Sequence, residues 1–167
     1  MKRILCLLLA AMMLFGGAFA EGEMPENVKN AYQTTGDYIE SLGAPQVGSV
    51  GGEWMVIGLA RSGREVPESY YASAEAYVRE NADEHGQLHR VKSTENSRMI
   101  LALTAIGADV TNVAGYNLLE PLGDMNFLGM QGNNGPIWAL IALDCGDYEL
   151  PDDANYIREM LVQSVLN

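Results

Sequence analysis

An apolar segment that ends at a glycine occurs three times in this chain, and two of the copies begin at a glycine-rich turn. In the most regular copy, residues 133–146, Pro136 lies near the start, seven apolar residues follow in a row, and Gly146 comes last. Proline is tolerated in the first turn of a helix, and a glycine just past the last turn can take the left-handed cap conformation. The other copies are residues 51–63 and 96–107. A repeat of roughly 40 residues predicts stacked helical units, because one unit alone cannot bury its apolar face.

The stretches around these segments are expected to form amphipathic helices. Residues 25–42 place apolar side chains at helical spacing, which predicts a helix with one face against the core. Residues 67–80, 113–120 and 154–162 each follow one apolar segment and are expected to form its amphipathic partner. An apolar helix followed by an amphipathic one predicts an inner and an outer layer.

The apolar runs at residues 100–103 and 137–143 also have the length of buried parallel strands. They are rich in Ala and Leu and contain few β-branched residues, which favours helices. Each also lies in a window of about ten or more residues, longer than most strands. The sequence therefore predicts an all-α fold, with a central sheet as the alternative.

The first residues of the chain have the features of a signal peptide. Lys2 and Arg3 precede an apolar stretch at residues 4–15, and a small-x-small cleavage site follows. The stretch is short for a helix that spans a bilayer, although an uncleaved anchor is the alternative. We therefore expect a signal peptide at residues 1–20 and an exported domain at residues 21–167, secreted or held at the cell surface.

The chain is acidic, with 22 acidic and 10 basic residues and a net charge of −12. Loss of residues 1–20 removes two of the basic residues, so that 8 remain and the net charge becomes −14. Such a surface repels phosphate backbones and anionic lipids, which argues against nucleic-acid or membrane partners. It is compatible with cationic ligands, or with solubility alone. Cys145 would be the only cysteine left, so no internal disulfide is expected. We expect its side chain to be a small buried hydrophobic group.

The turn before the third apolar segment, residues 131–138, reads QGNNGPIW. It resembles the prenyltransferase and squalene-oxidase repeat, whose characteristic spacing is Gln-x-x-x-Gly-x-Trp. The matching residues are Gln131, Gly135 and Trp138, with one extra residue in the spacing, and, in a looser copy, Gln46, Gly52 and Trp54. The family includes terpenoid cyclases, protein prenyltransferase β subunits and the cobalamin carriers intrinsic factor and transcobalamin. The resemblance implies an α/α toroid, a ring of inner helices wrapped by outer ones, of which residues 25–167 would form about half.

The catalytic motifs of that family have no counterpart here. Class II cyclases carry Asp-x-Asp-Asp, and the nearest acids in this chain are Asp152 and Asp153 in an expected loop. Prenyltransferases bind zinc through Asp, Cys and His, but His85 and His89 lie far from Cys145 in the sequence. The acids near residue 150 do not have the spacing of a calcium loop. We therefore expect no catalytic residues and no metal site.

The loops before the inner helices carry the candidate ligand-binding residues. In a toroid these loops would face one mouth of the ring, an apolar concavity with a few polar groups. The candidates are Gln46, Glu53, Trp54, Gln131, Asn133, Asn134 and Trp138. The resemblance implies a small apolar or amphipathic ligand, with cobalamin or another corrinoid as one candidate. The alternative is that the Gln and Trp side chains brace adjacent repeats.

The expected function is thus an exported, non-catalytic binding or interaction module. Two alternatives remain, a terpenoid cyclase-like or glycan-acting enzyme whose catalytic residues lie in a missing half, and a structural surface module. The helix at residues 154–162 is not followed by a capping segment. We expect either a truncated protein or an association through this last helix.

Overall fold

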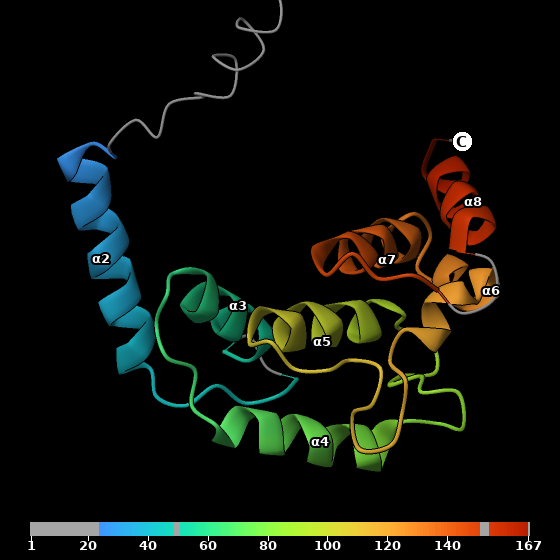
Figure 1. Ribbon diagram of the computed structural model, residues 1–167, viewed down its shortest axis with the longest axis horizontal. Helices are drawn as coiled ribbons and strands as arrows, with labels where there is room; N and C mark the ends of the chain where they lie inside the picture. The colour runs from blue at the N-terminus through green and yellow to red at the C-terminus, as the bar shows by residue number, and fades with distance from the viewer. Residues whose placement is uncertain (1–23, 49–50, 151–153, 167) are drawn as a thin grey trace, which may run out of the picture. The chain divides into compact units, whose positions relative to one another are not determined.

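The computed structural model describes residues 24–48, 51–150 and 154–166. The chain divides into two compact units, Met1–Thr35 and Gly36–Asn167. The helices, in chain order, are α2 (Glu26–Ser41), α3 (Glu53–Arg61), α4 (Ser69–Asn81), α5 (Thr94–Ala105), the 3-10 helix η1 (Glu120–Gly123), α6 (Met125–Gly129), α7 (Asn134–Cys145) and α8 (Ala154–Leu166) (Figure 1).

The fold is all-α throughout the described ranges. They contain no β-strand, and only an isolated backbone bridge joins Val113 to Tyr116. The all-α prediction is confirmed, and the alternative of strands at residues 100–103 and 137–143 is wrong. None of the described helices is long and apolar enough to cross a bilayer.

Three helices, α3, α5 and α7, end in the same way. In each one a backbone N–H bonds the carbonyl of a buried leucine five residues earlier, which closes the last turn. The pairs are Arg64 N to Leu59 O at 3.0 Å, Ala108 N to Leu103 O at 2.9 Å and Tyr148 N to Leu143 O at 2.9 Å. The residue before each donor has positive φ, namely Gly63 at 72°, Gly107 at 75° and Asp147 at 55°. The three apolar helices are therefore structural repeats.

The third copy departs from the predicted cap by one residue. Gly146 has φ −127°, so the prediction that it takes the left-handed conformation is wrong. Asp147 takes it instead, and aspartate is one of the few non-glycine residues that do so readily. The glycine at position 146 has another role, because a Cβ there would collide with the ring of Tyr148.

The three repeated helices run in parallel with α5 in the middle, where it packs against both α3 and α7. Near their starts, the rings of Trp54 and Trp138 are in contact across the layer. Toward their ends, Ile57, Leu101 and Cys145 line one hollow. Because residues near the starts of the helices contact one another, and residues toward their ends do so as well, all three helices point the same way.

Helix α4 packs on α5 from one side (Figure 1). Tyr70, Ala74 and Val78 lie one turn apart and are fully buried, so α4 presents a single apolar stripe. The Tyr70 hydroxyl contacts the sulfur of Met99 at 4.0 Å, and burial raises the pKa of this hydroxyl. The predicted amphipathic helix after the first apolar segment is confirmed.

The predicted amphipathic helix at residues 113–120 is wrong. Val113 and Tyr116 exchange two backbone hydrogen bonds around Ala114 and Gly115, which both have positive φ. This tight turn stops a helix from forming, and Pro121 restricts the chain shortly afterwards. The apolar side chains that suggested a helix are buried in the core as a compact loop.

Helix α2 also differs from expectation, because Gly36 is its only buried residue. The prediction of an apolar face against the core is wrong at Tyr38, which is exposed. Ion pairs hold the end of α2 instead. The Arg64 guanidinium lies against Gly36 and pairs with Asp37 at 2.9 Å and Glu40 at 2.7 Å. At the other end of the chain, α8 packs on α7 through buried Leu161.

Alanine at two helix glycines should have opposite effects on stability, because one glycine is tightly packed and the other is not. A Cβ on Gly135 would collide with the backbone carbonyl of Leu128 and lie 2.8 Å from Ser93 Oγ. Gly135→Ala should therefore lower the free energy of unfolding by about 1–3 kcal/mol through overpacking. At Gly58 on α3 no atom lies within 4 Å of the added Cβ. Gly58→Ala should raise stability by about 0.5–1 kcal/mol, and urea unfolding of both variants measures the contrast.

Candidate functional site

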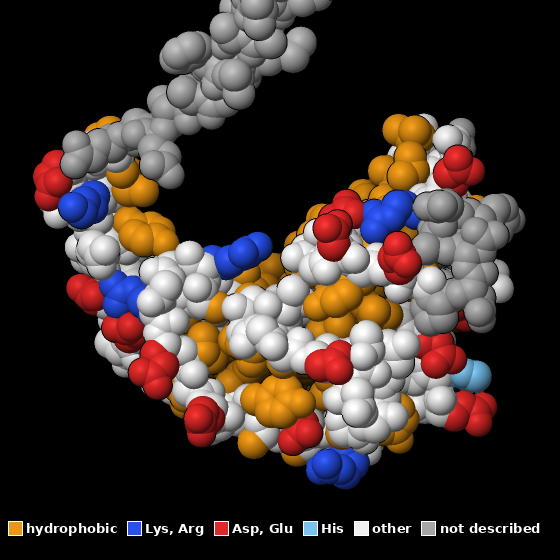
Figure 2. Space-filling view, in the orientation of Figure 1, with side chains coloured by type: hydrophobic (Ala, Val, Ile, Leu, Met, Phe, Trp, Pro, Cys, Tyr) orange, Lys and Arg blue, Asp and Glu red, His pale blue; other side chains and the backbone are white. Residues whose placement is uncertain are grey.

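Helices α3, α5 and α7 share one face that is only partly covered. The three helices can be aligned on the leucines whose carbonyls close their last turns, Leu59, Leu103 and Leu143. The residues five before, two before and two after each leucine then lie on one face. We call it the shared face, and its three levels are Trp54, Arg98 and Trp138, then Ile57, Leu101 and Ile141, and finally Arg61, Ala105 and Cys145. None of these nine residues is fully buried. Figure 2 shows hydrophobic side chains that reach the surface over α5 and α7.

The first level of the shared face is an aromatic pair. The rings of Trp54 and Trp138 have centroids 5.3 Å apart and an interplanar angle of 59°, within the range that favours aromatic contact. They are the two tryptophans of the chain, and Trp54 is still 45% exposed. The structure thus brings together two candidate residues that are 84 positions apart, since 138 minus 54 is 84.

The third level opens into a hollow of about 190 Å³. It is lined by Ile57, Arg61, Leu101, Thr104, Ala105 and Cys145. The Thr104 hydroxyl is 2.8 Å from that of Tyr148, which ties the end of α7 to α5. Burial raises the pKa of the Cys145 thiol, an effect that the hydrogen bond with Thr104 partly offsets. Arg61 is exposed and forms no ion pair with a described residue.

Glu53 has a structural role. Its side chain is 1% exposed, and Oε1 accepts a hydrogen bond from Gly48 N at 2.9 Å. Oε2 lies 3.0 Å from Arg98 Nε as an ion contact, although the two atoms are not aligned as a hydrogen bond. Arg98 also pairs with Glu95 at 2.5 Å, as expected for residues three apart on a helix. Glu53 therefore joins α3 to α5, and its carboxylate is not open to a ligand.

Gln131 braces the repeats, as the alternative for this residue predicted. Its Oε1 accepts hydrogen bonds from Thr94 N at 2.9 Å and Ser93 Oγ at 3.2 Å. It thereby caps the start of α5, where Ser93 occupies the N-cap position but makes no capping bond of its own. A glutamine in the loop before α7 thus holds the preceding inner helix.

Two further polar candidates stay apart from this network. Asn133 and Asn134 are exposed at the start of α7, and their side chains form no hydrogen bond with a described residue. Gln46 is exposed in the loop before α3. The residues predicted from the sequence do not include Arg61 or Leu101. Arg61 lies four residues after Ile57, and Leu101 lies four residues before Ala105, so helical spacing places each pair on one helix face.

No group of three metal-binding side chains comes together in the described part of the chain. His85 Nδ1 is 3.2 Å from Glu120 Oε1, and His89 Nδ1 accepts the backbone N–H groups of Val91 and Lys92. Both histidines therefore make contacts within the connecting loops. The acid pair at 152 and 153 lies outside the described residues.

No protein family, curated protein or solved structure matched this chain in sequence and structure comparisons.

The long-range cap of α5 predicts a stability effect that depends on an oxygen acceptor. Gln131→Ala should lower the free energy of unfolding by about 1 kcal/mol, because it removes the acceptor for Thr94 N. Gln131→Glu should retain stability, since a carboxylate still accepts and its charge suits a helix N-terminus. Urea unfolding at pH 7 compares the two variants, and equal losses would contradict a capping role.

The raised pKa of Cys145 predicts that its thiol reacts slowly with alkylating reagents. At pH 8 a smaller fraction is thiolate than in a free cysteine, whose pKa is about 8.5. Iodoacetamide should modify Cys145 several-fold more slowly in the folded chain than in urea. Peptide mass spectrometry at timed intervals measures this site separately from Cys6. Equal rates in both states would contradict the assignment.

Proposed function

We propose that this chain is an exported, non-catalytic binding module built as part of an α/α toroid of the prenyltransferase and squalene-oxidase type. Three parallel inner helices, repeated with the same ending and joined by Glu53 to Arg98 and by Gln131 to Thr94, support that architecture. Export is inferred from residues 1–20, which lie outside the described residues. The ligand would lie on the shared face.

The observation that carries the binding proposal is the tryptophan pair on the shared face, in which Trp54 is exposed and Trp138 half-buried. Trp54 is 45% exposed and Ile141 42% exposed, while the layer on the other side of these helices is fully packed. Contiguous exposed apolar surface of this kind is typical of interaction sites. Two rings in contact also present a broad aromatic surface on which the apolar part of a ligand can pack.

The polar features of the face define the ligand class. Arg61 lies two helical turns from Trp54, about 10 Å along α3. Its guanidinium pairs with no acid in the described part of the chain, and such a group favours a phosphate, carboxylate or other acceptor group. The ligand is therefore amphipathic, with an apolar or ring-shaped body over Trp54 and Trp138 and an acceptor group near Arg61. A corrinoid, which the family resemblance implies, has these features.

The hollow at the third level is too small to hold such a ligand alone. Its volume of about 190 Å³ is below the roughly 300–1,000 Å³ of pockets that enclose drug-sized molecules. The ligand would extend along the shared face and place one group in the hollow beside Thr104 and Cys145.

A second candidate is a protein-contact module that associates through its last helix. Leu166 on α8 is 73% exposed, and Val162 one turn earlier is exposed as well. Concentration-dependent dimerisation that is lost in Leu166→Glu, with tryptophan emission unchanged, would favour this candidate.

Tryptophan emission tests the binding proposal directly, because the whole signal comes from the proposed site. Cyanocobalamin and the neutral dye Nile red, titrated into the full chain, should change this emission saturably and raise the melting temperature. Trp54→Ala should weaken binding by about tenfold or more, given the apolar area lost. Arg61→Gln should weaken only the ligand that carries an acceptor group, cyanocobalamin.

Arg79→Gln is the matched control, since Arg79 is exposed on α4 and lies outside the shared face. Circular dichroism checks that each variant is folded. If Trp54→Ala unfolds the chain while Trp54→Phe folds and binds both probes with unchanged affinity, the tryptophans brace the repeats and the binding proposal fails. It also fails if neither probe changes the emission.

A further inference from the structure

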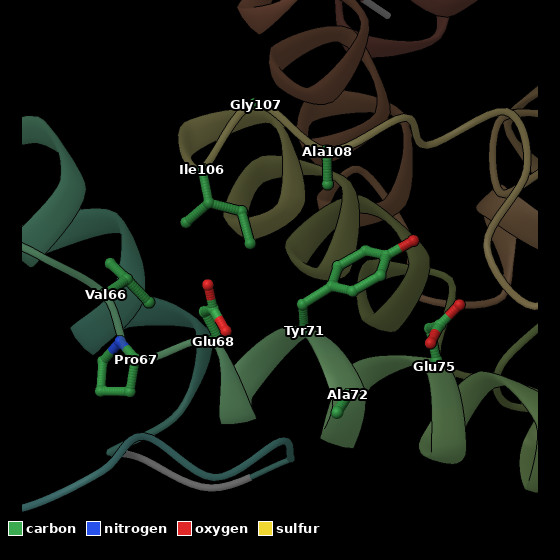
Figure 3. Close-up of a pocket in the computed structure, with 9 residues that line it drawn as sticks. All are labelled: Val66, Pro67, Glu68, Tyr71, Ala72, Glu75, Ile106, Gly107 and Ala108. Atoms are coloured by element: carbon green, nitrogen blue, oxygen red, sulfur yellow. The ribbon is translucent and has the colours of Figure 1, made fainter.

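A second surface lies between α4 and the end of α5 and shares no residue with the shared face. It is an open groove of about 550 Å³. Figure 3 shows its lining, with α4 along one side and residues 106–108 along the other. The apolar part of the lining includes Val66, Pro67 and Ile106.

Two carboxylates and one aromatic ring face this groove from the same side of α4. Glu68, Tyr71 and Glu75 are spaced i, i+3 and i+7, which places them in one row along the helix. In Figure 3 the Tyr71 ring lies between the two carboxylates. Figure 2 likewise shows a hydrophobic patch over α4 with acidic side chains around it.

The two acids have no counter-ion in the described part of the chain. Neither Glu68 nor Glu75 makes a side-chain hydrogen bond or an ion pair there, and no basic residue lines the groove. Glu75 and Tyr71 are both partly buried by the groove walls. The chain as a whole carries a net charge of −12, which raises the local concentration of cations.

We propose that this groove binds an aliphatic diammonium ligand, a diamine or polyamine. Seven residues of α-helix separate the two acids by about 10 Å along the axis. One ammonium group would pair with Glu68 and the other with Glu75. The methylene chain would cross the face of Tyr71 and contact Val66 and Ile106, so that charge and apolar surface are both matched. A single metal ion fits poorly, since two carboxylates about 10 Å apart cannot share one ion.

Isothermal titration of the full chain at low salt, with a series of α,ω-diamines, tests this proposal. Affinity should be highest when the extended distance between nitrogens is about 10 Å, near 1,7-diaminoheptane and 1,8-diaminooctane. 1,4-Diaminobutane and octylamine should each bind about two- to fivefold more weakly, because each loses one ion pair. Affinity should fall as salt is added.

Substitutions assign the site. Glu68→Gln, Glu75→Gln and Tyr71→Ala should each weaken binding of 1,8-diaminooctane by about two- to fivefold. Glu80→Gln is the matched control, since it removes one acid from the same helix outside the groove, and it should leave affinity unchanged. Circular dichroism confirms that the variants are folded.

Three results would overturn the proposal. They are no binding at millimolar diamine, an affinity independent of chain length, and equal effects of Glu80→Gln and the groove substitutions. The last two would mean that cations respond to the net charge alone.

Discussion

The position of α5 between its two neighbours depends on two polar links that reach across the layer. On one side buried Glu53 pairs with Arg98, and on the other Gln131 caps the first turn of α5. A buried ion pair adds little net stability once desolvation is counted, but either partner left alone is costly. These links therefore mainly fix how the three helices are aligned along their axes. The three levels of the shared face follow from this alignment.

The open face is a consequence of how the repeats are covered. Helices α3 and α7 are largely apolar, yet packing against α5 and against the core beneath uses only part of that surface. Trp54 and Ile141 stay exposed because no described element lies over them. Surface of this kind persists when a partner or ligand covers it in function, since it otherwise favours aggregation.

The two surfaces proposed for ligands have opposite electrostatic character. The shared face carries Arg61 as a cation without an ion-pair partner among the described residues, whereas the groove beside α4 carries Glu68 and Glu75. An anionic group that suits one is repelled by the other. Two chemically distinct ligands can therefore occupy the chain without competing.

The sequence alone determined where the inner helices lie, because glycine stops and apolar runs are local signals that act within one helix. The tertiary structure decided the rest. Residues 113–120 form a turn and loop, since Ala114 and Gly115 adopt positive φ, and their apolar neighbours Val113, Leu118 and Leu119 reach the core without a helix. The acceptor that caps α5 is Gln131, 37 residues from Thr94, and the Trp54–Trp138 contact joins different repeats. Such contacts depend on how loops bring helices together, which periodicity within one segment does not specify.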